Sequence, residues 1–284
     1  MQIRTALQNI EDIAPGFDRL TIWIDHPSPD LPVEDIRKHC GNISVMPCKS
    51  VKYHNVWQTQ IELFQPSSTA LKALRNTTGH RYRTKLSYAE IALDWITSDE
   101  AQARELWTFF VTHFKLQSSR HHVQFFGDTA YYKPRSVEQS GRNACNLVVY
   151  PDRPSKLNVP NTVGKPCCHL EYRLSHPAMI GKVASLFTVA DCVAFDHQRF
   201  WQQHLTLFEI PSKADLGRIL QRNKAHTSEA AHRKRAATFL DKRTHDGIYA
   251  LQDCVLDFEV VSRILKPIDN HHFLKTQPKS DEGP

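Results

Sequence analysis

Residues 86–95 read LSYAEIALDW, and their alternation of apolar and acidic side chains is typical of a β-strand. In a strand, successive side chains point to opposite faces of the sheet. Ile91 and Leu93 therefore share one face, and Glu90 and Asp94 share the other. The pattern predicts a strand whose apolar face packs on a core and whose second face carries two carboxylates separated by one small residue.

Strand and helix patterns follow one another on both sides of this segment. Alternation predicts further strands at residues 17–24, 56–64, 122–126, 129–132, 146–150 and 169–174. Helical spacing predicts helices at residues 33–40, 69–75, 99–114, 179–187 and 189–195, the third with Ser98 as its N-cap. Residues 200–208 fit either type. The mixture predicts an α+β domain over residues 1–210, a small basic helical region over 211–270 and a flexible tail over 271–284.

The composition is that of a globular chain. Of its 284 residues, 40% are hydrophobic and 23% are charged, which provides a core and argues against a disordered chain. No apolar run approaches the ~18 residues of a membrane-spanning helix. The first residues lack the pattern of a signal peptide, so we expect a cytoplasmic protein with no membrane partner. The seven cysteines include no Cys-x-x-Cys pair, which favours free thiols over a zinc ribbon.

The net charge of +6 is concentrated in one segment. Between Lys213 and Arg243 the chain has nine basic and three acidic residues, so this segment carries the whole excess. A basic block on an otherwise balanced chain indicates a polyanionic partner, and nucleic acid is the usual one. We therefore expect the region 211–270 to bind DNA.

Three acidic residues are candidate metal ligands. Glu90 and Asp94 share one strand face, and paired carboxylates suit Mg²⁺ or Mn²⁺, which prefer oxygen ligands. Glu171 lies in another predicted strand, where it shares a face with His169 and Arg173. Two plainer interpretations stay open: Glu90 and Asp94 belong to a solvated strand face, and Glu171 is simply the ion-pair partner of Arg173.

Tyrosines supply a candidate nucleophile. Tyr131, Tyr132 and Tyr150 lie in or at the end of predicted strands, and a tyrosine attacks phosphorus once a metal or basic residues favour its phenolate. The alternative for each is a core or interface residue. The sequence has no Gly-rich phosphate loop, no Gly-x-Ser-x-Gly elbow and no His-x-His with a hydrophobic central residue, the metal motif of HUH endonucleases. These absences argue against a nucleotide-driven enzyme and a serine hydrolase.

Three short blocks, in this order, resemble the replication-initiation proteins of rolling-circle plasmids and filamentous phages that lack the HUH motif. Residues 90–94 (EIALD) are similar to the strand Asp-Leu-Ala-Ile-Asp of that family. Residues 129–135 and 147–153 are similar to its Thr-x-Tyr-x-Gly-x-Arg hairpin and the following strand that ends in Tyr-Asp-Lys. Residues 169–173 are similar to its strand with Arg-x-Glu. The resemblance spans about residues 17–210.

The resemblance implies a fold, a reaction and a set of site residues. The fold would be a curved antiparallel sheet with packed helices, often as two similar lobes. The reaction would be origin-specific nicking and strand transfer, in which a tyrosine forms a 5′-phosphotyrosine link and leaves a free 3′-OH. Tyr150 would be the nucleophile and Tyr131 the reserve candidate. Glu90, Asp94 and Glu171 would hold Mg²⁺ or Mn²⁺, which polarises the phosphate.

The chain departs from the family pattern at several positions. Glu90 stands where Asp is usual, Lys133 stands where Gly is expected, and Pro151 directly follows the tyrosine of the Tyr-Asp-Lys block. These departures leave the choice of nucleophile open between Tyr150 and Tyr131.

Basic residues outside and inside the C-terminal region are candidate DNA contacts. The candidates are Arg81, Arg83, Lys85, Arg135, Arg153, Arg218, Arg222, Lys224, Arg233, Lys234 and Arg235. Phosphate contacts of this kind predict an affinity that falls steeply with salt. The expected partners are origin DNA and the host helicase and polymerase, and a homodimer stays open as the oligomeric state.

Two rival functions are compatible with parts of the sequence. A non-catalytic, sequence-specific DNA-binding protein, either a repressor or a degenerate initiator, accounts for the basic region equally well. A small-molecule enzyme that uses a free cysteine lacks a positioned base. The arrangement of the acids separates the first rival from a nickase, because only a nickase needs Glu90, Asp94 and Glu171 to converge with a tyrosine facing them.

Overall fold

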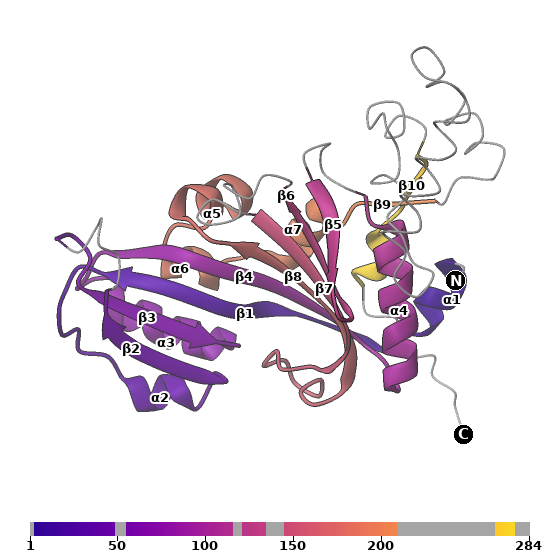
Figure 1. Cartoon of the computed structure of the whole chain (residues 1–284). Coiled ribbons are helices and arrows are strands. Elements are labelled where there is room, and N and C mark those ends of the chain that lie inside the picture. The colour runs from indigo at the N-terminus through magenta and orange to yellow at the C-terminus, as the bar shows by residue number, and fades with distance from the viewer. Residues whose placement is uncertain (1–2, 49–54, 116–120, 135–144, 210–264, 276–284) are drawn as a thin grey trace, which may run out of the picture.

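The structure is a computed structural model, and it describes residues 3–48, 55–115, 121–134, 145–209 and 265–275 (Figure 1). Its centre is one eight-stranded sheet in which every neighbouring pair is antiparallel. The strand order is β2-β3-β1-β4-β8-β7-β6-β5. The strands are β1 (Asp12–Ile24), β2 (Asn42–Pro47), β3 (Thr59–Phe64), β4 (Thr84–Ile96), β5 (His121–Phe126), β6 (Thr129–Pro134), β7 (Cys145–Pro154) and β8 (Pro166–Leu174).

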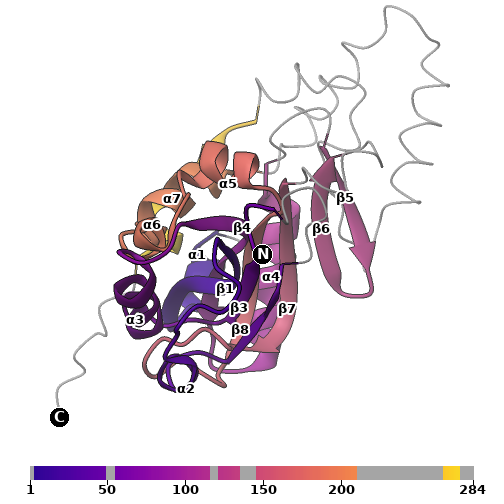
Figure 2. The ribbon, with the colours of Figure 1, turned by 90° about the vertical axis from the view of Figure 1, so that its left-hand side faces the viewer.

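Helices cover one face of this sheet. They are α1 (Ile3–Gln8), α2 (Val33–Arg37), α3 (Ser68–Thr78), α4 (Glu100–His113), α5 (Pro177–Ala184), α6 (Val189–Val193) and α7 (His197–His204). Their buried side chains join those of the strands in a single hydrophobic core. Figure 2 shows α3, α5, α6 and α7 gathered on the same side of the strands. The fold class is therefore α+β with an antiparallel sheet, as the sequence predicts, and strands β1 to β8 form one continuous sheet.

The long helix α4 illustrates how the core is built. It begins at Asp99, whose side chain accepts a hydrogen bond from the backbone N–H of Gln102, one residue after the predicted cap Ser98. Its aromatic side chains pack on the central strands, and the ring of Phe110 stacks on that of Trp95 at a centroid distance of 3.8 Å. Trp107 donates from Nε1 to the carbonyl of Val149 on β7 at 3.2 Å. The helix thus connects β4 and β7 across the core.

The predicted strands are confirmed, and the structure also contains elements whose sequences show only a weak strand or helix pattern. β2 and α1 carry no sequence prediction, because both are short and neither shows a sustained alternation. Residues 200–208, which fitted either type, contain the end of α7 and a two-residue strand, β9 (Leu207–Phe208). β9 pairs with β10 (Pro267–Ile268) in a second, two-stranded sheet.

The C-terminal segment returns to the core. The short 3-10 helix η4 (His271–Phe273) places Phe273 in the core, fully buried and stacked on Phe109 at 5.4 Å. Trp95 Nε1 donates to the carbonyl of Phe273 at 2.7 Å. The predicted flexible tail begins at residue 271, and this boundary falls too early because Phe273 and Leu274 are both buried in the core. Most of the predicted basic region, residues 210–264, lies outside the described residues.

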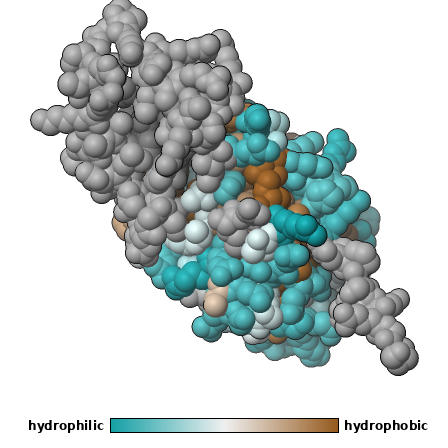
Figure 3. Space-filling model, turned by 90° about the vertical axis from the view of Figure 1, so that its right-hand side faces the viewer, coloured by the Kyte–Doolittle hydropathy of each residue, from teal (hydrophilic) through white to brown (hydrophobic). Residues whose placement is uncertain are grey.

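The opposite face of the sheet is polar, and a loop covers part of it. On β4, Tyr88, Glu90 and Asp94 point away from the helices, since the alternate positions belong to the hydrophobic core. The loop over residues 155–165 folds back on this face near the start of β1, where Leu157 lies against Gly16. The side of the molecule shown in Figure 3 is mostly hydrophilic, with a small hydrophobic area. No helix of the described residues is long and apolar enough to cross a membrane.

If the C-terminal return belongs to the core, shortening Phe273 should destabilise the whole domain. We expect Phe273→Ala to lower the free energy of unfolding by about 3–5 kcal/mol, the usual cost of removing a buried aromatic ring. Urea unfolding measures this change, and His272→Ala is the control because His272 is exposed. A loss below about 1 kcal/mol for Phe273→Ala would show that the segment contributes little.

The histidine that begins α7 is packed between aromatic rings. The ring of His197 lies edge-on to those of Phe17 and Phe195, both at a centroid distance of 4.8 Å. Its Nδ1 has no hydrogen-bond partner within the described part of the chain. Burial lowers the pKa of His197 from 6.5 to about 4. The imidazole is therefore neutral in the folded protein at neutral pH.

Acid should weaken the fold through this residue. The folded-state pKa of His197 lies below its unfolded-state value, so the unfolded chain binds more protons between about pH 6.5 and about pH 4. Stability therefore falls as the pH is lowered through this window. We expect His197→Gln to reduce that pH-dependent loss by up to about 3 kcal/mol in urea unfolding. Parallel pH profiles of wild type and variant would contradict this expectation.

Candidate functional site

The polar face carries a compact cluster where β4, β8 and β7 lie side by side. Asp94 on β4 pairs with His169 on β8, and His169 pairs with Tyr150 on β7, so the three residues form one row across the sheet. Glu171 and Arg173 follow His169 on β8 at alternate positions and point the same way. The antiparallel register thus brings together residues from three separate sequence blocks.

β1 adds a further carboxylate, Asp18, to those of Asp94 and Glu171, and it does so through an irregular position of the strand. Phe17 and Arg19 pair with β4, but Asp18 has no register partner there, so it is the extra residue of a β-bulge. Bulges redirect a side chain relative to the regular strand. Gln65, which has a left-handed φ of 42°, holds the position: its backbone N–H donates to the Asp18 carbonyl at 2.9 Å and its Nε2 to the Asp18 carboxylate at 2.6 Å.

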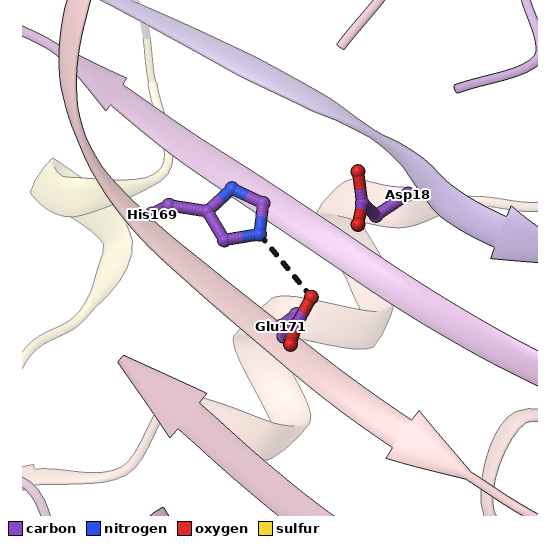
Figure 4. Close-up of side chains that lie close together, drawn as sticks. All are labelled: Asp18, His169 and Glu171. Atoms are coloured by element: carbon purple, nitrogen blue, oxygen red, sulfur yellow. Dashed lines mark hydrogen bonds and ion pairs between the residues drawn. The ribbon is translucent and has the colours of Figure 1, made fainter. Parts of the chain in front are cut away.

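Asp18, His169 and Glu171 form a candidate metal site. One ligand atom from each of the three lies within 4.8 Å of the others, and Figure 4 shows the three side chains around a common space. Two carboxylates and one imidazole mix the hard oxygen donors that Mg²⁺ and Mn²⁺ prefer with a nitrogen donor that suits transition metals. The donor set therefore fits Mn²⁺ better than Mg²⁺.

Asp94 lies behind the histidine of this cluster. Its Oδ1 bonds Nδ1 of His169, and its Oδ2 accepts a hydrogen bond from the hydroxyl of Ser155. The other ring nitrogen of His169, Nε2, faces Glu171 at 3.4 Å. A carboxylate that fixes a histidine in this way leaves the second nitrogen directed at a metal, a common arrangement in metalloproteins. Asp94 was predicted to be a metal ligand itself. In the structure it bonds His169 and so orients that candidate ligand.

Glu90 is placed against an arginine. Its carboxylate accepts a hydrogen bond from Tyr88 and lies 3.6 Å from Nε of Arg173. Arg173 also donates from Nε to Glu171 at 2.6 Å. The three predicted carboxylates are therefore linked in one network: Asp94 reaches Glu171 through His169, and Glu90 reaches it through Arg173.

Two tyrosines bond this network: Tyr88 through Glu90, and the predicted nucleophile Tyr150 through Glu171. The Tyr150 hydroxyl donates to Glu171 at 2.8 Å and accepts a hydrogen bond from Arg173. The guanidinium of Arg153 lies 4.0 Å from the centroid of the Tyr150 ring. Tyr131, the reserve candidate, has its ring 6.0 Å from the guanidinium of Arg173. Of the two candidate nucleophiles, Tyr150 is the one whose hydroxyl bonds a residue of the candidate metal site.

Tyr132 belongs to the core. It is buried, and its hydroxyl donates to the carbonyl of Val111 on α4 at 3.1 Å. Adjacent residues of a strand point to opposite faces, so Tyr131 lies on the polar face. The core interpretation that was left open for these tyrosines holds for Tyr132.

Burial and opposing charges set the protonation of the histidine. Burial alone lowers the pKa of His169, but the charge and hydrogen bond of Asp94, followed by those of Glu171, raise it well above its usual value. Burial raises the pKa of Glu171, yet the hydrogen bonds and charges of His169 and Arg173 leave it lowered. Without a cation, the site therefore holds an imidazolium between two carboxylates. A divalent ion would replace that proton as the source of positive charge.

Glu90 and Tyr150 have pKa values displaced toward their neutral forms. Burial, and then the charge of Glu171, raise the pKa of Glu90 to about 7. The same two causes raise the pKa of the Tyr150 phenol well above its usual value. Tyr150 is therefore protonated in this environment, and its ionisation requires additional positive charge nearby.

The predicted DNA contacts have different surroundings. Arg81 and Arg83 pair with Asp30 and Asp25, at 3.4 and 2.7 Å. Lys85 is exposed and forms no ion pair within the described residues. The candidates that lie outside the described residues are Arg135, Arg218, Arg222, Lys224, Arg233, Lys234 and Arg235. Their predicted role is not addressed by the structure.

Sequence reasoning missed two of the three residues of the candidate metal site. His169 had a usable signal, because it shares a strand face with Glu171 at a spacing of two. Asp18 had none, since only the bulge in β1 turns it toward β8. Ser155, which bonds Asp94, follows β7 directly, in the loop over residues 155–165.

If these three side chains hold a metal, removing one carboxylate should weaken metal binding. We expect Asp18→Asn to lower the affinity for Mn²⁺ at least about ten-fold in isothermal titration calorimetry, because it removes an anionic ligand. The matched control is Glu62→Gln, a carboxylate on the same face that bonds Arg19. Equal affinities of Asp18→Asn and wild type would show that the cluster is not a metal site.

Comparison with known proteins finds no match for this chain. No family model matches the chain, and no curated protein or solved structure is significantly similar to it. The functional interpretation therefore rests on the geometry of the site and on the three sequence blocks that led to it.

Proposed function

We propose that this protein is a metal-dependent enzyme that nicks and transfers a DNA strand through a tyrosine, as initiators of rolling-circle replication do. One observation carries the proposal: the hydroxyl of Tyr150 donates at 2.8 Å to Glu171, and Glu171 is also part of the candidate metal site. A nucleophile and a metal ligand are thus in direct contact. This contact is what transfer of a phosphoryl group to tyrosine requires.

The reaction would exchange one phosphodiester for another. The Tyr150 oxygen forms a bond to phosphorus while the bond from phosphorus to the 3′-oxygen breaks, which leaves a 5′-phosphotyrosine and a 3′-OH. The phenolic proton passes along its hydrogen bond to Glu171, and the departing 3′-oxygen takes a proton from solvent water. A bound Mg²⁺ or Mn²⁺ would polarise the phosphate and favour the phenolate. The reverse reaction rejoins the strand and releases Tyr150.

Two arginines are placed to support this chemistry. Arg173 donates to the Tyr150 hydroxyl, so its charge stabilises a phenolate there. Arg153 stacks over the same ring and is exposed, so its guanidinium can contact an incoming phosphate. Glu90 holds Arg173 from the side of β4. In this proposal the predicted site residues of β4, β7 and β8 each have a role in the reaction.

The proposed setting follows from the reaction. An initiator of this kind would act in the cytoplasm on origin DNA. It would leave the 3′-OH to a host polymerase, with a host helicase to open the duplex. The basic region 211–270 would bind the origin through contacts with its phosphates, and such contacts make the affinity strongly dependent on salt.

A non-catalytic DNA-binding protein is the second candidate, and one observation favours it. Tyr150 is only 5% exposed, and its hydroxyl is satisfied by both Glu171 and Arg173. A buried, fully bonded tyrosine is also what a purely structural network contains. Formation of a covalent DNA adduct separates the two candidates.

A nicking assay tests the proposal. The protein is incubated with Mn²⁺ and supercoiled plasmids that carry candidate origins, and relaxed circles and covalent protein–DNA adducts are measured. We expect adducts with wild type and with Tyr131→Phe, and a loss of at least about a hundred-fold with Tyr150→Phe, because this change removes the hydroxyl that attacks phosphorus.

The outcomes of this assay have distinct meanings. Equal adduct from wild type and Tyr150→Phe would exclude Tyr150 as the nucleophile. Loss of adduct in Tyr131→Phe alone would assign the role to Tyr131. Retention of salt-dependent DNA binding without any adduct, in a protein that binds Mn²⁺, would favour the non-catalytic candidate.

A further inference from the structure

Two tryptophans lie at the surface of the sheet, away from the buried ones. The rings of Trp23 on β1 and Trp57, just before β3, have centroids 6.4 Å apart, and both side chains are half-buried. The other three tryptophans of the chain, Trp95, Trp107 and Trp201, are at most 2% exposed. Trp23 and Trp57 are therefore the tryptophans that a molecule on the surface can reach.

Trp23 points to the same face as the candidate active site. Its neighbours along β1, Ile22 and Ile24, belong to the core, so Trp23 faces away from the helices. Its register partners are Gln60 on β3 and Lys85 on β4. Gln60 accepts a hydrogen bond from the indole N–H at 3.4 Å.

An arginine and further aromatic rings fill the space between the tryptophans and the site. The guanidinium of Arg19 lies 5.2 Å from the centroid of Phe64 and 5.4 Å from that of Tyr88. Tyr88 in turn bonds Glu90, which contacts Arg173 of the site. Arg19, which also pairs with Glu62 at 2.9 Å, and Tyr88 therefore lie on the same face as Trp23, on the side toward the network around Tyr150.

The distance along β4 from Lys85 to the candidate site suits an extended chain. From Lys85 to Asp94, β4 advances nine residues, which corresponds to about 30 Å at about 3.3 Å per residue. Among the cations predicted to contact DNA at the start of β4, Lys85 is the one without an acidic partner in the described part, whereas Arg83 is engaged by Asp25. Lys85 is therefore available to a phosphate beside the indole of Trp23.

We infer that this strip, defined by Trp23, Trp57, Arg19, Tyr88 and Lys85, binds a single strand of nucleic acid that leads to Tyr150. The inference deepens the proposed function, on which it rests for the direction of the strand. Aromatic rings stack on unpaired bases whatever their sequence, and interleaved cations contact the phosphates. Paired bases offer no free face to half-buried rings, so a single strand binds in preference to a duplex.

Binding is measured without cleavage. A fluorescein-labelled oligo(dT) of about 20 nucleotides, longer than a typical stacking site, is titrated with protein in EDTA at low salt while its anisotropy is followed. We expect Trp57→Ala and Trp23→Ala each to weaken binding roughly ten-fold, the range measured for loss of one stacked base. Trp57→Phe and Trp23→Phe should restore most of the affinity. Lys85→Ala should reduce the salt dependence by about one ion.

The controls address fold, face and strand type. Phe187→Ala removes another exposed aromatic ring, which lies between α5 and α6 on the helical side, and should leave the affinity unchanged. Thermal unfolding confirms that each variant is folded, and the Phe variants keep the test valid if an Ala variant is not. A duplex of the same length should bind more weakly. Affinities within two-fold of wild type for both Ala variants, or equal binding of duplex and single strand, would overturn the inference.

Failure of this inference is distinguishable from failure of the proposed function. If Tyr150→Phe and wild type both form no adduct but bind oligo(dT) through Trp23 and Trp57, the strip stands as a single-strand site and the nickase proposal fails. If wild type forms adducts and the tryptophan variants bind and react normally, the strip is refuted and the nickase proposal stands.

Discussion

The buried carboxylate of Asp94 lies at the centre of the sheet, and a buried charge is stable only if groups of the protein compensate it. The Asp94 side chain is fully buried on β4, where loss of a partner would cost several kcal/mol. His169 and Ser155 bond its two oxygens, His169 meets Glu171, and Glu171 meets Tyr150. The register of β4, β8 and β7 must hold for this chain of contacts to close, because a slip of one residue would turn every one of these side chains into the core.

Much of the fold could be predicted from local pattern. The alternation in residues 86–95 and the spacing of aromatic residues in α4 are strong because each element has one face in the core and one face outside it. β2 and α1 were not predicted, because they are short and their burial depends on neighbours distant in sequence. Phe273 could not be predicted for a related reason. It and Leu274 are two adjacent core residues, too few to show a period, and contacts such as those of Phe273 with Trp95 and Phe109 reveal their place.

The candidate site was predictable to the extent that it follows regular strands. Glu171 and Tyr150 were singled out from strand positions, and the antiparallel register brings them into contact. The division of labour between ligands and supporting residues was not predictable, because it depends on which side chain reaches which neighbour across strands. Asp18 shows the limit most clearly: a bulge in β1, held by Gln65, decides where its carboxylate points.

The pairing of β9 with β10 has a consequence for how this protein can vary. The backbone N–H of Glu209 donates to the carbonyl of Lys266 at 2.8 Å, so the chain leaves the core and re-enters it at neighbouring points. The basic stretch between these two residues is therefore attached as an insertion, closed at its base, and not as an appendage at the end of the chain. The entropic cost of closing such a loop grows only slowly with its length. A chain with this fold can therefore lengthen, shorten or exchange this stretch while the sheet and its polar face stay the same.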